Sequence, residues 1–392
     1  MPEPTLPSTD DLIDRDAARL YARLGARPVI NAAGAYTVLG GSQLSPGVRQ
    51  AMEEANRYFA DMKTLLGTSG AIIAGLLEAE SALVTSGAAA ALTLASAAIL
   101  TKDHPERFEL LPHTQGFPHE ILTQRLSRQK YDRCVEFSGA RLVEYGNGNG
   151  TTVDQLKAAI SDDTVALHYF VPPGRESGLL PLETVIEVAH DRGLPVIVDA
   201  AGHTYPVDEM RKYVRAGADL VAYANKYFDG PHSTGTLVGR KDLVDLALTN
   251  SFVGFETSGY LTIGRPMKVD RQEIFATVVA LQEWLAMDHE DRLLRYGERC
   301  DLVLHSLAGI AGIDAYRISE RETPLPVVRE GVKIDMPSAA AAETVVQRLR
   351  DGDPCIWIRS EGSQVILSVG FCSDDEFGLV AHRLRTAMEG NN

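Results

Sequence analysis

Short apolar runs alternate with amphipathic stretches over most of the chain. Runs such as "PVIVDAAG" and "DLVAYAN" are almost wholly apolar, and "LETVIEVAHDRG" between them has the apolar spacing of a helix. Strands that are buried on both faces lose the alternation of apolar and polar residues, and strands that alternate with helices are typical of a parallel sheet. The pattern therefore predicts an α/β fold with a mostly parallel sheet.

The last third of the chain has a different organisation. A helical stretch over 271–307 is followed by short strands, "CIWIRS" and "QVILSVGF", and by helices over 338–350 and 374–388. A chain of 392 residues exceeds what one compact core usually holds, so two domains are expected. We expect an N-terminal arm over 1–30 with a helix over 10–24, a large domain over 31–268 and a small α+β domain over 269–392. Residues 1–41 could fold with either domain.

Composition narrows the range of partners. The net charge of −15 opposes attraction to a phosphate backbone, so we expect no nucleic-acid partner. No apolar run is long enough to span a bilayer, and the alanine-rich segment over 88–100 is better explained as a buried helix. The N-terminal segment lacks a signal-peptide pattern, and the four cysteines form no CxxC pair. These features predict a cytoplasmic protein without a metal site, acting on a small molecule.

Asp199 and Lys226 each follow an apolar strand, and one helical stretch separates them. Side chains at the carboxyl ends of neighbouring parallel strands meet at one edge of the sheet, where ligands bind. Taken alone, such a carboxylate is as often an N-cap or a strand-end hydrogen bonder as a functional group. Such a lysine, taken alone, is usually a surface residue or part of an ion pair. Together they suit pyridoxal 5'-phosphate (PLP), which needs an amine to form an imine and a carboxylate to keep its pyridine nitrogen protonated. We interpret Lys226 as the Schiff-base lysine and Asp199 as the partner of the ring nitrogen.

The motif "VTSGAAAAL" predicts a strand, a tight turn and a helix. Ser86, Gly87 and Ala88 are small, so backbone N–H groups at the helix N-terminus can approach an anion that the helix dipole favours. Alone, this would be a plain small-residue turn. Beside Asp199 and Lys226, we interpret it as the binding site of the PLP phosphate.

Several long motifs resemble one enzyme family. They are "INAAGAYTVLGGSQLSP", "EAESALVTSGAAAAL", "TQRLSRQKYD", "PVIVDAAG", "GADLVAYANKYFDGPHSTGTLVGR", "IGRPMKV" and "GDPCIWIR", and they cover nearly all of the chain. They resemble the fold type I PLP enzymes, which have the aspartate-aminotransferase-like fold, and more narrowly the SelA-like group of D-glucosaminate-6-phosphate ammonia-lyases. The resemblance implies a mostly parallel sheet of seven-stranded type and a homodimer or higher homo-oligomer.

The resemblance also implies roles for individual residues. Arg359 in "CIWIRS" matches an arginine that holds the substrate carboxylate, for which a planar guanidinium is suited. Its other interpretation is a solvated strand residue. Arg265 in "IGRPMKV" could bind an anion or form an ion pair at the domain boundary, and Tyr36 could reach the substrate from either subunit. The resemblance implies that the cofactor-binding residues are Lys226, Asp199, Ser86, Gly87, Ala88 and Ala201. Of these, Ala201 would pack under the cofactor ring.

Two stretches depart from the family pattern. Ser127 stands where relatives often have a histidine that stacks on the cofactor ring. Phe228 and Asp229 replace a stretch that carries an arginine in the relatives, which removes a positive charge that could meet a substrate phosphate. The second change argues against a sugar phosphate as the substrate.

The resemblance implies an ammonia-lyase that converts an amino acid or amino-sugar acid to a 2-oxo acid and ammonia. Residue chemistry alone supports only amine chemistry through PLP. Racemisation, aldol cleavage, transamination and selenium or sulfur transfer use the same groups. A non-catalytic PLP-fold binding protein is a further alternative.

Overall fold

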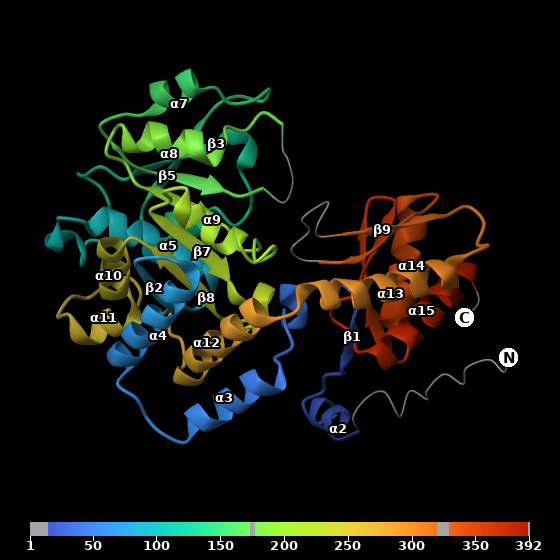
Figure 1. The fold of residues 1–392 in the computed structure, drawn as a ribbon. Helices are drawn as coiled ribbons and strands as arrows, with labels where there is room; N and C mark the ends of the chain where they lie inside the picture. Colours follow the sequence, from blue (N-terminus) through green and yellow to red (C-terminus); the bar gives the residue numbers. More distant parts are fainter. Residues whose placement is uncertain (1–14, 173–176, 320–328, 391–392) are drawn as a thin grey trace. The chain divides into compact units, whose positions relative to one another are not determined.

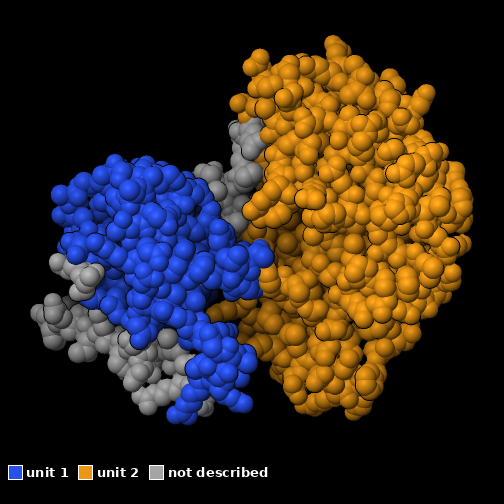
Figure 2. All heavy atoms as spheres, turned by 180° about the vertical axis from the view of Figure 1, so that it is seen from behind, with its two compact units in different colours: residues 1–41, 287–392 blue, residues 42–286 orange. Residues whose placement is uncertain are grey.

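The computed structural model describes residues 15–172, 177–319 and 329–390. The chain forms two compact units, each with its own hydrophobic core (Figure 1; Figure 2). The small unit, blue in Figure 2, comprises Met1–Gly41 and Met287–Asn392, and the large unit, in orange, is Ser42–Ala286. Among the described helices, none has the length and apolar character needed to cross a membrane.

In the described part of the large unit, a seven-stranded sheet of order β2-β8-β7-β6-β5-β3-β4 forms the centre (Figure 1). The strands are β2 (Ser81–Thr85), β3 (Glu120–Gln124), β4 (Arg141–Tyr145), β5 (Thr164–Phe170), β6 (Val196–Asp199), β7 (Leu220–Ala224) and β8 (Gly235–Gly239). All run in the same direction except β8, which is antiparallel to both of its neighbours. Most strand residues are buried, which explains the apolar runs in the sequence.

Helices and short 3₁₀ turns surround this sheet. The helices are α3 (Pro46–Asn56), α4 (Met62–Leu77), α5 (Gly87–Thr101), α6 (Arg133–Glu136), α7 (Val153–Ala159), α8 (Leu182–His190), α9 (Glu209–Arg215), α10 (Lys241–Asn250), α11 (Phe252–Thr257) and α12 (Arg271–Ala286). The 3₁₀ turns are η2 (Pro105–Arg107), η3 (Arg125–Ser127) and η4 (Asn225–Phe228). The nearly all-apolar α5 packs against β6, β7 and β8, and α12 packs on α3 and α4.

The small unit combines an antiparallel sheet with helices. Its sheet has the order β12-β13-β10-β9, and a separate pair joins β1 and β11 in parallel. The strands are β1 (Val29–Asn31), β9 (Asp314–Ile318), β10 (Gly331–Asp335), β11 (Cys355–Trp357), β12 (Arg359–Glu361) and β13 (Gln364–Ser368). The helical elements are α2 (Arg15–Arg23), η1 (Thr37–Leu39), α13 (His289–Leu307), α14 (Ala339–Asp351) and α15 (Asp374–Glu389). Ser373 and Glu376 form a capping box that begins α15.

The predicted α/β fold with its mostly parallel sheet is confirmed, whereas the unit boundaries lie at other positions than expected. The large unit extends beyond 268 to Ala286, because α12 places Leu281 and Trp284 in its core. Residues up to Gly41 group with the small unit, where β1 pairs with β11. Of the expected helix over 10–24, α2 is described and residues 10–14 lie outside the described residues. The helices α10 and α11 and the strand β9 are additions to the predicted elements.

Candidate active site

The backbone register brings three chain segments together at one edge of the large sheet. Gly235, at the start of β8, pairs with Thr85 at the end of β2 on one side and with Ala224 at the end of β7 on the other. The N–H of Ala224 in turn donates to the carbonyl of Ala201, just beyond β6, at 3.0 Å. The turns that follow β2, β7 and β6 therefore lie in one row, hereafter the site row.

Lys226 lies in η4, directly after β7, as the sequence predicts. Its side chain is partly buried, and its ammonium nitrogen lies 5.0 Å from the centre of the Tyr227 ring. Burial lowers the pKa of Lys226 below its ordinary value. A lowered pKa increases the fraction of neutral amine, which is the form that attacks a carbonyl or accepts a proton.

Asp199 ends β6 in the same row and is only 2% exposed. Its Oδ1 accepts a hydrogen bond from the N–H of Ala201 at 3.1 Å, and the amide nitrogen of Gln129 lies 3.5 Å from its Oδ2. Burial raises the pKa of Asp199 to about 6, the Ala201 N–H opposes this rise, and the nearby charge of Asp132 adds to it. A buried carboxylate with so few donors gains most from a cationic N–H partner.

The third segment of the site row is the turn between β2 and α5. Gly87 has a φ of +86°, which suits glycine, and in the described structure no side-chain hydrogen bond caps this end of α5. The hydroxyl of Thr85 donates to the carbonyl of Gly87 at 3.0 Å and stabilises the turn. Ser86 and Ala88 are partly exposed beside it. Backbone N–H groups at the start of a helix bind anions, so this turn can hold a phosphate.

Gly235 approaches this turn so closely that no side chain fits. A Cβ at this position would lie 2.3 Å from the backbone carbon of Gly87 and 2.5 Å from the backbone nitrogen of Ala88. Both are backbone atoms, so the start of α5 would have to move.

Gly235→Ala is therefore expected to lower the affinity for PLP and to destabilise the protein by about 1–3 kcal/mol. Equilibrium unfolding and a PLP titration measure the two effects. Gly148→Ala is the matched control, because a Cβ there meets nothing within 4 Å. Equal behaviour of the two variants would contradict the close approach at Gly235.

Together, the residues of the site row fit PLP. The aldehyde of PLP requires an amine, its pyridine nitrogen requires a carboxylate, and its phosphate requires an anion-binding group. The site row offers an amine, a buried carboxylate and a helix N-terminus that follows a glycine and has no side-chain cap. Lys226 would hold the aldehyde carbon, Asp199 the ring nitrogen, and Ser86, Gly87 and Ala88 the phosphate. Ala201 follows the strand that carries Asp199 and offers only a methyl group.

The predicted substrate-binding residues lie outside the site row. Arg359 and Tyr36 belong to the small unit and lie together, with the guanidinium carbon 5.5 Å from the centre of the Tyr36 ring. Arg359 also forms an ion pair with Glu361. Arg265, in the large unit, forms an ion pair with Glu256 at 3.0 Å. An ion pair is the second of the two interpretations of this residue.

Gln129 and Asn225 are neighbours of the site row whose roles the sequence does not predict. Ser127, where a stacking histidine was expected, is buried and donates its hydroxyl to the carbonyl of Gln124 at 2.9 Å. Two positions later, Gln129 is the residue that approaches Asp199. The motif "TQRLSRQKYD" locates this segment after β3, but only the folded sheet brings it to β6.

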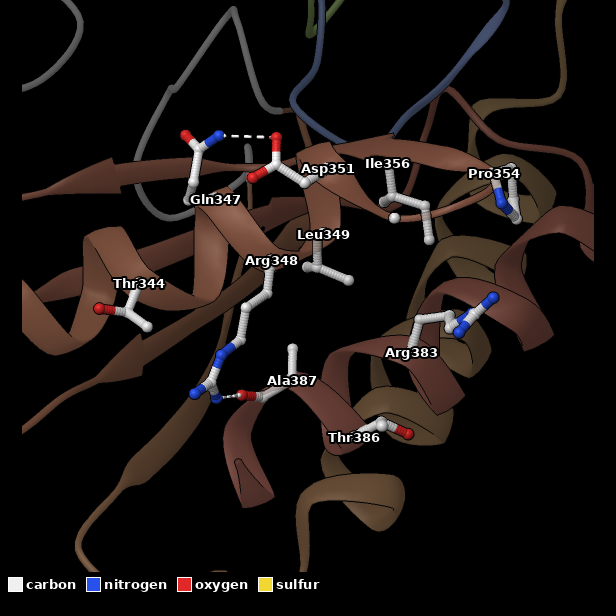
Figure 3. A pocket seen from close by; sticks show the side chains of 11 residues that line it. Thr344, Gln347, Arg348, Leu349, Asp351, Pro354, Ile356, Arg383, Thr386 and Ala387 are labelled. Carbon is white, nitrogen blue, oxygen red and sulfur yellow. Dashed lines mark hydrogen bonds between the residues drawn. The ribbon is translucent and has the colours of Figure 1, made fainter. Parts of the chain in front are cut away.

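A hollow of about 550 Å³ lies between α14 and α15 of the small unit (Figure 3). Two arginines on its wall bond to backbone carbonyls. Arg348 donates to Ala387 and Arg383 donates to Asp353, both at 2.6 Å. None of the predicted site residues lines this hollow, and we assign it no part in the site.

Known proteins resemble the chain over most of its length. It is 31% identical over 350 residues to 5'-C-glycyluridine monooxygenase-decarboxylase from a Streptomyces species, covering 86% of this chain and 84% of that protein. It is 29% identical over 384 residues to D-glucosaminate-6-phosphate ammonia lyase from Salmonella typhimurium, covering 94% and 98%. The solved structure of a D-glucosaminate-6-phosphate ammonia-lyase matches with a TM-score of 0.79 and 26% identity, covering 95% of this chain and 98% of that one. No protein-family model matches the chain.

These similarities extend over both compact units. The predicted resemblance to the ammonia-lyase group is thereby confirmed, and the selenium transferases that act on L-seryl-tRNA(Sec) are more distant relatives. The chain belongs to the fold type I family of PLP-dependent enzymes, in the group that contains D-glucosaminate-6-phosphate ammonia lyase and 5'-C-glycyluridine monooxygenase-decarboxylase.

Proposed function

We propose that this protein is a PLP-dependent ammonia-lyase that converts a β-hydroxy amino acid or an amino-sugar acid to a 2-oxo acid and ammonia. The observation that carries the proposal is the site row, in which Lys226, Asp199 and the turn at Ser86 lie at one sheet edge. The similarity to D-glucosaminate-6-phosphate ammonia lyase over 94% of the chain supports this choice among PLP reactions.

The residues of the site row would divide the work. Bound PLP supplies an electron sink for the substrate α-carbon. Lys226, whose pKa is lowered by burial, would hold the cofactor covalently and, as a free amine, would accept the substrate α-proton at Nζ. Asp199 holds the proton on the ring nitrogen, and the start of α5 anchors the phosphate. Loss of the β-hydroxyl as water, followed by hydrolysis that consumes one water, gives the 2-oxo acid and ammonia.

Arg359 and Tyr36 are proposed to bind the substrate carboxylate. Their stacking orients the planar guanidinium, whose fork matches a carboxylate. We propose Arg265 as a further contact for an anionic substrate, since its side chain is 41% exposed beside Glu256.

We propose a cytoplasmic homodimer or higher homo-oligomer. The segment between α3 and α4 exposes two aromatic side chains, Tyr58 (78%) and Phe59 (94%). Exposed aromatic residues of this size are typical of interfaces between subunits. Sedimentation of the PLP-loaded protein tests the oligomeric state.

Oxidative decarboxylation of an amino acid is a second candidate function. The observation that favours it is the 31% identity to the Streptomyces monooxygenase-decarboxylase. The loop after Lys226, where Phe228 is buried and Asp229 is acidic, agrees with a substrate that has no phosphate. Neither residue offers a cation to a substrate phosphate. The Streptomyces relative is named for a glycyluridine substrate, without a phosphate in its name.

A substrate panel distinguishes the two functions. The PLP-loaded protein is incubated with β-hydroxy amino acids, sugar-derived amino acids and nucleoside-linked amino acids, and ammonia, 2-oxo acid, carbon dioxide and oxygen consumption are measured. Ammonia and 2-oxo acid in equal amounts, without oxygen consumption, are expected. Oxygen-dependent release of carbon dioxide would favour the second candidate, and inversion of the α-carbon alone would contradict both.

A further inference from the structure

A cluster of polar side chains is buried directly beside Lys226. Asn225, the preceding residue, is fully buried, and its amide nitrogen donates to Thr234 Oγ1 at 2.9 Å and to Thr277 Oγ1 at 3.2 Å. Its amide oxygen accepts from Thr236 Oγ1 at 2.9 Å. The three threonines are each at most 1% exposed. We call Asn225, Thr234, Thr236 and Thr277 the Asn225 network.

The same residues close the loop that begins with Lys226. The N–H of Asn225 donates to the carbonyl of Thr234 at 3.1 Å, and the carbonyl of Asn225 accepts from Gly230 at 2.9 Å. The Thr234 hydroxyl also donates to the carbonyl of Pro231 at 2.8 Å. Both ends of the loop are therefore held by Asn225, and Lys226 is the next residue along the chain.

Thr277 connects this loop to a distant element. It lies on α12, which packs on α3 and α4 and contacts η4. Its hydroxyl approaches Thr234 Oγ1 at 3.2 Å and accepts from Asn225. A buried amide that loses one of these partners has no water to replace it, so the network favours one arrangement of η4 over others.

We infer that Asn225, and through it Thr277, are positioning residues that fix Lys226 for its bond to PLP. The inference rests on the proposed function, because Lys226 must meet the aldehyde of a cofactor whose phosphate is anchored across Gly235. A buried polar network whose members are fully hydrogen-bonded rigidifies its surroundings and specifies one arrangement of them. A general stabilising role would leave the reactivity of Lys226 unchanged.

A matched pair of valine variants separates positioning from stability. Thr277→Val removes a hydroxyl from the Asn225 network with little change in volume. Thr101→Val is the control. Thr101 is 1% exposed, accepts from the amide of Asn250 at 3.0 Å and ends α5, at the opposite end of the helix from the turn at Ser86. Thr236→Val interrupts the network from a second side, and Thr277→Ser restores the hydroxyl.

Each full-length variant is titrated with PLP and followed by absorbance, by the pH midpoint of that absorbance and by thermal unfolding. Borohydride reduction followed by mass spectrometry gives the covalently bound fraction. Thr277→Val and Thr236→Val are expected to bind PLP about 2- to 10-fold more weakly, with a shifted pH midpoint, from the loss of one buried hydrogen bond. Thr277→Ser is expected to recover wild-type values, and Thr101→Val to lose only thermal stability.

The two proposals fail in different ways. If wild-type protein forms no covalent adduct with PLP, the proposed function is overturned, and the inference with it. If wild type forms the adduct and Thr277→Val and Thr236→Val match Thr101→Val in affinity and pH midpoint, the inference alone is overturned. If Thr277→Val does not fold, Thr236→Val and Thr277→Ser decide the question. A Thr277→Ser protein that binds PLP more weakly than wild type would contradict a role for the hydroxyl, because serine retains it.

Discussion

Lys226→Ala is expected to abolish covalent attachment of PLP and to lower turnover by about 100- to 10 000-fold. The first effect follows because the side chain of alanine has no amine, and the second because a positioned general base contributes about that factor. The start of α5 and Asp199 remain in place, so PLP is expected still to bind non-covalently. Mass spectrometry after borohydride reduction measures the first effect, and initial rates of 2-oxo acid release measure the second.

Lys241→Ala provides the control for this prediction. Lys241 lies on the surface of α10, 66% exposed, and pairs with Asp245 at 2.7 Å. Its loss is expected to change neither attachment nor turnover. A Lys226→Ala protein that still carries covalent PLP would show that another lysine holds the cofactor and would invalidate the assignment.

Asp199→Asn is expected to stabilise the cofactor-free protein at neutral pH while weakening its function. Burial holds the pKa of Asp199 at about 6 in the folded protein, against an ordinary value of 3.8. Below pH 3.8 the group is neutral in both folded and unfolded chains. As the pH rises from 3.8 to 6 the unfolded chain ionises first, so the folded protein loses stability, and the whole loss is present above pH 6.

This difference of about two pKa units corresponds to about 3 kcal/mol. Asparagine carries no charge, so the variant is expected to be about 2–3 kcal/mol more stable than wild type at pH 8 and equal to it near pH 3. Denaturant unfolding across this pH range measures the difference. With PLP present, the variant is expected to turn over about 10- to 100-fold more slowly, because a charge-assisted hydrogen bond to the ring nitrogen is lost.

Asp219→Asn is the matched control for Asp199. Asp219 is also buried, but it pairs with Arg240 and accepts the N–H of Val196 at 2.8 Å. Breaking a paired carboxylate is expected to destabilise the protein at neutral pH and to leave PLP binding unchanged. If Asp199→Asn proved less stable than wild type at pH 8, the surroundings of Asp199 would have to stabilise its charged form. That result would contradict a pKa that burial raises.

The central part of the site is predictable from the sequence because each group follows a strand that is recognisable locally. Lys226 and Asp199 end apolar runs, and Ser86 lies between a strand and an alanine-rich helix. Parallel strands then bring their carboxyl ends together without further information. The sheet order and the antiparallel direction of β8 come only with the structure.

Other parts of the site depend on contacts between distant residues. Gln129 reaches Asp199 across 70 positions and Thr277 reaches Asn225 across 52, and neither residue belongs to a local pattern that signals the contact. The unit boundary shows the same limit. The helix α12 has a weakly amphipathic sequence, and only its packing on α3 and α4 assigns it to the large unit.

The reversed strand β8 also affects how the protein is made. Within the described residues, β2 is at the end of the large sheet and hydrogen-bonds only to β8. The ribosome must therefore release the chain through Gly239 before β2 has a strand to pair with. Until then β2 and the apolar α5 lack part of their final packing, which makes them the segment that chaperones are expected to protect during synthesis. A nascent chain that ends before Gly239 contains Asp199 and Lys226, but its turn at Ser86 is not yet held in the sheet by β8. PLP is therefore expected to bind only after β8 has left the ribosome.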